Sequence, residues 1–184
     1  YKKFTWYLYG FGVFLLMMLF IIPTGSFAVE INGAKSWFKT PIGNIQPAEF
    51  MKTFYILGLA WVISKHHEIT PIKTIKTDLV LLGKMFGALL IPLFFIMQQP
   101  DLGSALVFLA ITAALIIVAG VTWKIILPVF VAAAGIGSSL LWMAIYQQDF
   151  IQNTLGFDPY QLARVYSWLD PYSYAASEGY HLIT

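Results

Sequence analysis

The sequence predicts an all-α protein that crosses a membrane several times as a bundle of helices. Two features of its composition indicate this fold class: 59% of the 184 residues are hydrophobic, and only 11% are charged. A soluble domain would carry roughly 25% charged residues. The third observation is that apolar segments of about 17 to 25 residues, the length that the bilayer core requires, recur along the chain. We therefore expect one integral membrane domain over residues 1–184.

Five transmembrane spans are expected, because charged residues, glycines and prolines punctuate the apolar runs. The expected spans are residues 4–23, 45–64, 79–98, 104–121 and 125–146, and the longer polar loops are residues 24–44 and 147–184. Asn44 is the predicted N-cap of the second span, and Pro47 falls in its first turn, where a missing N–H costs little. The chain opens on Tyr1 rather than Met, so we expect a piece of a longer protein.

The distribution of basic residues predicts how the spans are oriented. Cytoplasmic loops of membrane proteins carry an excess of Lys and Arg. One set of loops holds Lys2, Lys3, Lys65, Lys73, Lys76 and Lys124, and the other holds only Lys35, Lys39 and Arg164. With the first set in the cytoplasm, the loop around Trp37, the turn at Asp101 and the C-terminal loop all face outward. This convergence predicts a polar site between helices at the outer membrane face.

Charged residues inside the expected spans are the first candidates for that site, because an ionisable group at membrane depth costs about 2.5 kcal/mol or more. Glu49 and Lys52 are three residues apart, so they share a helix face and can neutralise one another. They are either a structural ion pair, with Lys52 snorkelling outward, or a charged wall of a polar cavity. Lys84 is interpreted as a snorkelling or packing residue.

Other residues leave the chemistry open. Asp101 either caps the fourth helix or belongs to the site. Residues 66–68 (His-His-Glu) have the composition of a metal cluster, but adjacent histidines lack the i, i+4 spacing, and no metal site is predicted. Soluble-enzyme motifs are missing, no cysteine is present, and a net charge of +2 does not indicate nucleic-acid binding. The residues alone do not choose between enzyme, transporter and scaffold.

Four motifs in order carry a resemblance to a known family. They are residues 32–37 (Asn-Gly-Ala-Lys-Ser-Trp), residues 46–49 (Gln-Pro-Ala-Glu) with Lys52, residues 99–105 (Gln-Pro-Asp-Leu-Gly-Ser-Ala), and residues 160–164 (Tyr-Gln-Leu-Ala-Arg) with the Leu-Asp-Pro at 169–171. Together they resemble the shape, elongation, division and sporulation family, the RodA/FtsW/SpoVE proteins, and the outer loop is closer to the RodA branch. The resemblance implies ten spans, of which this chain would supply the third to the seventh.

The resemblance also implies an activity. Family members are multi-pass proteins of the bacterial cell membrane and peptidoglycan glycosyltransferases. They polymerise lipid II outside the membrane during elongation, shape maintenance or division, and they work with a class B penicillin-binding protein. The alternatives are a lipid II flippase and a non-catalytic scaffold for that partner. No nucleic acid is expected as a partner.

Position by position, the resemblance assigns substrate-binding roles to a small set of residues: Trp37, Glu49, Lys52, Asp101 and Arg164. The departing diphosphate needs positive charge, from side chains or from a divalent cation, and no cofactor is assigned. The catalytic base is expected beyond Thr184, in a later loop motif of the family. Asp170 is not assigned that role, because an Asp-Pro pair is typical of an exposed turn. Residues 1–184 alone are therefore expected to be inactive.

Overall fold

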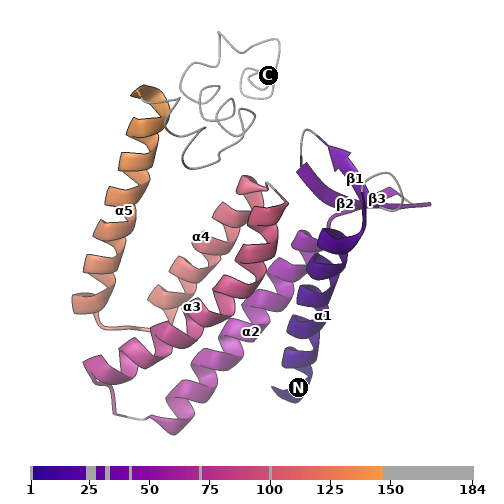
Figure 1. The fold of residues 1–184 in the computed structure, drawn as a ribbon. Helices are drawn as coiled ribbons and strands as arrows, with labels where there is room; N and C mark the ends of the chain where they lie inside the picture. The colour runs from indigo at the N-terminus through magenta and orange to yellow at the C-terminus, as the bar shows by residue number, and fades with distance from the viewer. Residues whose placement is uncertain are drawn as a thin grey trace. The chain divides into compact units, whose positions relative to one another are not determined.

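Five α-helices and one small β-sheet make up the described part of this computed structural model (Figure 1). The structure describes residues 2–23, 28–31, 34–41, 43–70, 72–99 and 101–146. The helices are α1 (Lys2–Ile21), α2 (Pro47–Ile69), α3 (Ile75–Gln98), α4 (Leu102–Val118) and α5 (Trp123–Tyr146). The all-α class is confirmed, and the predicted outer loop at 147–184 lies outside the described residues.

The sheet is the main departure from the predicted fold, because it occupies a segment that the sequence indicated only as a polar loop. Its strands are β1 (Ala28–Ile31), β2 (Ala34–Thr40) and β3 (Gly43–Ile45), in the order β1-β2-β3. Both pairings are antiparallel, with Ala28 opposite Phe38 and Phe38 opposite Ile45. Gly43 has a φ of 137° at the tight β2–β3 connection, a conformation that favours glycine. Backbone pairing therefore satisfies amide groups of a loop that lies next to the helix ends.

Two helix boundaries differ from those predicted, each for a local reason. Asn44 lies in β3 opposite Lys39, so it does not cap α2, and the cap prediction is wrong. Gln46 occupies the N-cap position, and Pro47 begins the helix as predicted. At the other end α2 continues to Ile69, so the two histidines lie in its last turn rather than in a loop.

Helix α3 begins earlier than the sequence predicted because of a capping box. The Thr74 hydroxyl accepts a hydrogen bond from the Thr77 backbone N–H at 3.3 Å, and the Thr77 hydroxyl accepts one from the Thr74 N–H at 2.9 Å. Asp78 therefore lies in the first turn of α3. Its carboxylate accepts hydrogen bonds from the backbone N–H and hydroxyl of Thr122, at 2.9 and 2.6 Å, just before α5 begins.

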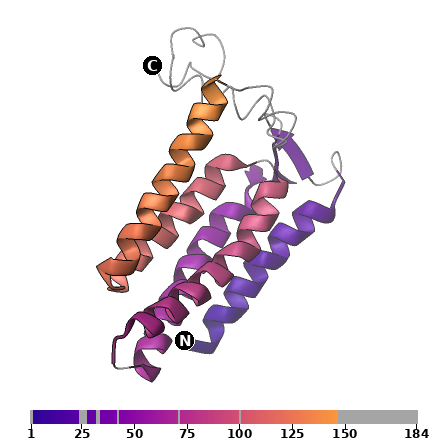
Figure 2. The ribbon, with the colours of Figure 1, turned by 60° about the vertical axis from the view of Figure 1, so that its left-hand side comes forward.

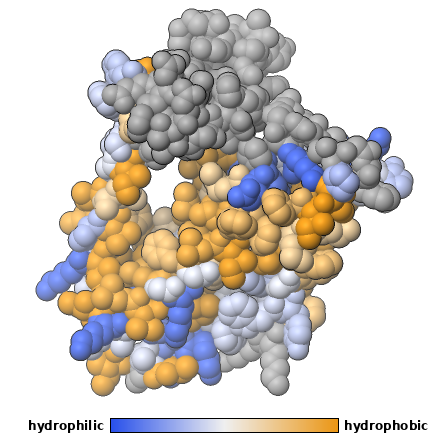
Figure 3. All heavy atoms as spheres, in the orientation of Figure 1, coloured by the Kyte–Doolittle hydropathy of each residue, from blue (hydrophilic) through white to orange (hydrophobic). Residues whose placement is uncertain are grey.

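Length and hydropathy suit several of these helices to a bilayer. Among the described residues, three helices are long and apolar enough to cross a membrane: α1 over Phe4–Ile21, α3, and α5 over Trp123–Met143. Helix α4 is apolar but has 17 residues, and α2 carries Glu49 and Lys52 near its start. On the face drawn in Figure 3, hydrophobic side chains cover most of the helical surface. The protein is a multi-pass membrane protein, and the five predicted spans remain a prediction.

The chain divides into two units, Tyr1–Leu127 and Pro128–Thr184, and the first contains α1 to α4 and the sheet. In that unit α1 packs along α2, α2 along α3, and α3 along α4 (Figures 1 and 2). Their contact surfaces are apolar: the largest fully buried side chains include Leu16, Met51, Tyr55, Leu59, Met85, Leu89 and Phe108. Gly12 permits close approach of α1 and α2, because a Cβ there would collide with the side chain of Met51.

A polar contact inside the unit compensates for a proline in α3. Pro92 has no N–H, so the carbonyl of Ala88, four residues earlier, lacks its usual helical donor. The Tyr9 hydroxyl of α1 donates to that carbonyl at 2.6 Å. An unsatisfied carbonyl is costly where water is scarce, so this bond holds α1 to α3 and satisfies the freed group.

We expect Tyr9→Phe to lower the free energy of unfolding of the intact protein by about 1 kcal/mol, the net value of one such hydrogen bond. Denaturant unfolding in detergent micelles measures this, with Tyr7→Phe, on an exposed residue of the same helix, as the control. In a Pro92→Ala background the restored N–H satisfies Ala88, so the cost of Tyr9→Phe should shrink. An equal cost in both backgrounds would contradict the proposed compensation.

Candidate functional site

The candidate site lies at the end of the bundle where α2 begins, α1 and α3 end and the sheet is attached. Helix α2 starts directly after β3, so its first turn is tied to the antiparallel sheet of β1, β2 and β3, which we call the hairpin. The turn between α3 and α4 reaches the same end, because the side chain of Gln46 contacts Asp101. Two of the motif segments identified in the sequence are thus brought together by a side-chain hydrogen bond.

Glu49 and Lys52 form the predicted ion pair in the first turns of α2. The Lys52 ammonium lies 2.8 Å from the Glu49 carboxylate. Lys52 is the less exposed partner, with 19% of its side chain accessible against 57% for Glu49. The lysine reaches back toward the helix N-terminus, and Glu49 lies in the first turn, where the helix dipole favours negative charge. One of the three ammonium N–H donors is used by Glu49, which leaves donors for an anion.

Asp101 is the N-cap of α4, so the predicted cap is confirmed. One carboxylate oxygen accepts from the Ser104 backbone N–H at 3.0 Å, and the other accepts from the Ser104 hydroxyl at 2.7 Å. The second oxygen also accepts from the Gln46 side-chain amide at 2.7 Å. Three donors therefore occupy the carboxylate, and the chemistry that these contacts support is positioning rather than proton transfer.

Gln46 and Gln99 are the site residues whose roles sequence reasoning did not assign. The Gln46 side chain joins the start of α2 to the start of α4 through Asp101. The backbone carbonyl of Gln46 accepts a hydrogen bond from the Glu49 backbone N–H at 3.1 Å. Gln99 is almost fully buried at the end of α3, and its amide donates to the Leu16 carbonyl of α1 at 3.3 Å. Both belong to recognised motifs, but only the tertiary fold shows which partner each amide reaches.

The hairpin brings Trp37 and Lys35 to this end of the molecule. Trp37 lies in β2 opposite Val29 and is half-buried. Lys35 donates to the carbonyls of Ile22 and Phe20, the latter at 3.4 Å, and so places a positive charge at the C-terminal end of α1. The structure places Trp37 in the sheet at this end of the bundle, and among the described residues no hydrogen bond joins Trp37 to the Glu49–Lys52 pair. Arg164 lies outside the described residues.

Histidines at the opposite end of α2 do not build a metal centre in the described part of the chain. No group of three or more His, Asp or Glu side chains within the described ranges lies close enough to hold a metal ion. His66 is buried, and this burial, with Lys84 nearby, lowers the pKa of its imidazole. The neighbouring turn is held by an ion pair of Lys65 with Glu68 at 3.6 Å.

The fold and this site define a class of protein: a multi-pass membrane protein with a polar, charged cluster at one end of its helix bundle. The profile of the FtsW/RodA/SpoVE family, described as cell cycle protein, matches residues 1–184. The chain belongs to this family, and its family membership and helices place it in the bacterial inner membrane.

Individual relatives agree with this assignment. A probable peptidoglycan glycosyltransferase FtsW from Allochromatium vinosum is 31% identical over 185 residues, covering 96% of this chain and 40% of the relative. A protein of the same name from Lactococcus lactis is 37% identical over 124 residues, covering 61% of this chain and 29% of the relative. The chain thus spans about two fifths or less of the length of these relatives.

Solved structures support the fold as well. The crystal structure of the rod shape determining protein RodA from Thermus thermophilus has a TM-score of 0.55 and 29% identity, covering 73% of this chain and 41% of that one. A structure of a peptidoglycan synthase complex is described as coordinating polymerisation and crosslinking. It has a TM-score of 0.63 and 28% identity, covering 93% of this chain and 44% of that one. The predicted family is therefore confirmed, with relatives named both FtsW and RodA.

Proposed function

We propose that the intact protein is a peptidoglycan glycosyltransferase that polymerises lipid II at the outer face of the membrane. The observation that carries the proposal is the Glu49–Lys52 pair at the hairpin end of α2, in a chain whose relatives are named for this activity. The pair places a partly shielded ammonium where a lipid-linked diphosphate would lie. We expect α2 to cross the membrane, where charge is costly, and that cost favours a functional role for the pair over a purely structural one.

The reaction joins two lipid-linked sugars. The 4-hydroxyl of the incoming lipid II attacks the anomeric carbon of the growing glycan, the bond to the polyprenyl diphosphate breaks, and a base accepts the hydroxyl proton. Charge develops on the departing diphosphate. Lys52, with donors left over from Glu49 and limited access to water, is positioned to stabilise that charge. None of the residues described above is proposed as the catalytic base.

A penicillin-binding protein is the proposed partner. The solved structure with a TM-score of 0.63 to this chain is described as a complex that coordinates polymerisation and crosslinking. A polymerase of this kind requires a transpeptidase to link its strands, and we propose that a class B penicillin-binding protein supplies that activity. Trp37, Asp101 and Arg164 remain proposed contributors to the site through their positions in the family motifs.

Purified intact protein, assembled with its penicillin-binding partner in liposomes, is expected to convert labelled lipid II into glycan strands. Gel electrophoresis of the products measures this, with a partner variant inactive as a transpeptidase to show that crosslinking is not required. Movement of lipid II across the bilayer without polymer would indicate a flippase instead. Failure to form polymer, under conditions in which another polymerase works, would reject the proposal.

A further inference from the structure

Lys35 of β2 directs its ammonium at the C-terminal end of α1. It donates to the backbone carbonyls of Ile22 and Phe20, the latter at 3.4 Å. The last carbonyls of an α-helix lack intrahelical donors and form the negative end of its dipole. Helix α1 has no basic residue in its last turn, and Pro23, just after its end, has no N–H to offer. Lys35 therefore supplies from the hairpin a positive charge that the end of α1 lacks locally.

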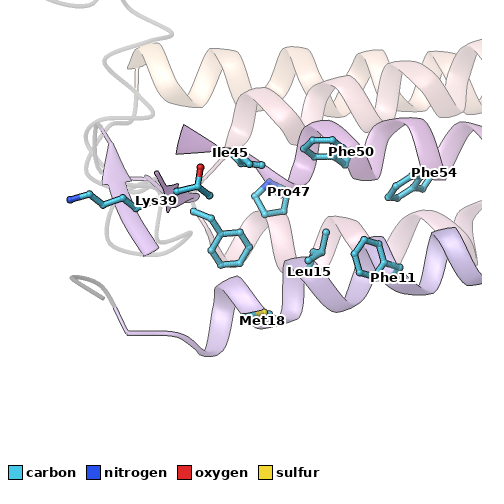
Figure 4. Close-up of a pocket in the computed structure, with 10 residues that line it drawn as sticks. Phe11, Leu15, Met18, Lys39, Ile45, Pro47, Phe50 and Phe54 are labelled. Carbon is cyan, nitrogen blue, oxygen red and sulfur yellow. The ribbon is translucent and has the colours of Figure 1, made fainter. Parts of the chain in front are cut away.

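Side-chain packing between the hairpin and α1 is incomplete. An apolar groove of about 480 Å³ lies between α1, the start of α2 and the hairpin (Figure 4). Met18 of α1, Phe50 of α2 and Phe38 of β2 all contribute to its lining. Side chains that face an open groove have no protein atoms to pack against on that side. The hydrogen bonds of Lys35 therefore contribute more to holding the hairpin on α1 than they would in a closely packed contact.

The backbone connects this contact to the start of α2. Strand β2 pairs with β3, with Phe38 opposite Ile45. Gln46, the N-cap of α2, follows β3 directly, and Lys52 lies in the first turns of the helix. A strand that is held on α1 at Lys35 therefore restricts how far the first turn of α2 can move from the end of α1.

Lys39 lies four residues farther along the same strand and makes no comparable contact. It is exposed, and Figure 4 shows its side chain extending away from the apolar side chains farther along the helices. Among the described residues no hydrogen bond or ion pair engages its ammonium. Lys35, by contrast, is half-buried. Because both lysines carry the same charge on one strand, a comparison of the two separates the contact with α1 from a general effect of positive charge.

We propose that Lys35 is a positioning residue of the candidate site: its ammonium fastens the hairpin to the end of α1 and thereby fixes the first turns of α2, which carry Lys52. We call this contact the anchor. The inference rests on the proposed function, in which Lys52 stabilises the departing diphosphate. Two of the three N–H donors of Lys35 are directed at backbone carbonyls, so the residue acts through Lys52 rather than on the substrate.

Hydrogen exchange of the intact protein in nanodiscs tests the anchor. Lys35→Met keeps an unbranched side chain but removes its charge and donors. We expect it to speed amide exchange about tenfold in peptides that cover β2, β3 and the first turn of α2, because these segments open more often without the anchor. Peptides from α3 and α4 should exchange at the unmodified rate, which shows that the variant is folded.

Lys39→Met is the matched control for the exchange measurement. It removes an equal charge from the same strand without touching the anchor, so exchange should stay at the unmodified rate. Unchanged exchange in Lys35→Met would overturn the proposal. Equal acceleration by both variants would overturn it as well, because charge on the strand would then matter rather than the contact with α1.

Polymerisation kinetics separate positioning from a contact that only stabilises the fold. We expect Lys35→Met to lower kcat about tenfold with little change in KM, since a misplaced Lys52 stabilises the departing diphosphate less well. Lys35→Arg keeps the charge and donors and should restore most of the rate. In a Lys52→Ala background, Lys35→Met should cost less than about twofold. A raised KM at unchanged kcat, or a full tenfold loss in that background, would contradict the proposal.

Hydrogen exchange requires no turnover, so it decides on the anchor whatever the polymerase assay shows. Faster exchange in Lys35→Met with an unchanged kcat would reject the positioning role. Absence of polymer from the unmodified protein would reject the proposed function and, with it, the role of Lys35 in the reaction. Unchanged exchange beside normal polymerisation would reject the anchor alone.

Discussion

Lys52→Ala is expected to reduce the rate of lipid II polymerisation by the intact protein roughly 100-fold, the effect of removing one preorganised group that stabilises developing charge. The Lys52 side chain is only 19% accessible, so its charge is less screened than that of a fully exposed lysine. Because the diphosphate gains charge only as the glycosidic bond breaks, kcat should fall more than KM rises.

Lys84→Ala is the matched control for this prediction. Lys84 is a second lysine within a predicted span, but it lies in α3 near His66, on the side away from the hairpin. Its replacement should leave polymerisation close to the unmodified rate at equal protein level. Equal losses for the two variants would count against a specific site at Lys52.

Two further substitutions separate charge from geometry. Lys52→Arg keeps the positive charge and should retain more activity than Lys52→Ala, although a planar guanidinium places its donors differently. Glu49→Gln keeps a hydrogen-bond acceptor for Lys52, so it should reduce the polymerisation rate less than Lys52→Ala does. If Glu49→Gln were as damaging as Lys52→Ala, the carboxylate would have a direct role that the present proposal does not give it.

The charged pair and the helical architecture could be predicted because local sequence determines them. Residues three apart on a helix face each other regardless of the rest of the fold, and Glu49 with Lys52 is such a pair. Long apolar runs likewise indicated five helical segments, and the structure has a helix in each of them. Pro92 could also have indicated an unsatisfied carbonyl at Ala88, although its partner Tyr9 is 79 positions away in sequence.

Contacts between distant segments could not be predicted in the same way. The sheet between α1 and α2 depends on pairing between short strands with weak alternation, such as Gly43–Ile45. The Gln46 amide reaches Asp101 across 55 positions, and no local pattern specifies that choice. The groove is also a tertiary product, because α1, α2 and the hairpin each supply only part of its lining.

Asp101→Ala should lower the free energy of unfolding by about 3 kcal/mol, the largest stability effect that we expect at the site. The change removes the cap of α4, worth about 1 kcal/mol, and the charge-assisted hydrogen bonds from Gln46 and the Ser104 hydroxyl, worth about 2 kcal/mol more. Denaturant unfolding of the intact protein in detergent measures the loss. Asp101→Asn preserves the shape of the side chain and one acceptor oxygen, so it should lower the free energy of unfolding less than Asp101→Ala does.

A double-mutant cycle between Gln46→Ala and Asp101→Ala isolates the contact between the two motifs. We expect a coupling energy of about 1.5 kcal/mol, as for a hydrogen bond to a charged group. A coupling near zero would contradict the 2.7 Å contact as a stabilising interaction.

Activity measurements separate two roles for Asp101: holding α2 and α4 in place, or contacting the substrate directly. Its carboxylate oxygens are already engaged by three donors, so the residue acts by holding α2 and α4 in register. Polymerisation per folded molecule should therefore fall less in Asp101→Ala than in Lys52→Ala, and Gln46→Ala should reproduce part of that fall. If Asp101→Asn retained full stability but lost activity as completely as Lys52→Ala, Asp101 would have to contact the substrate, and the assignment of positioning would be wrong.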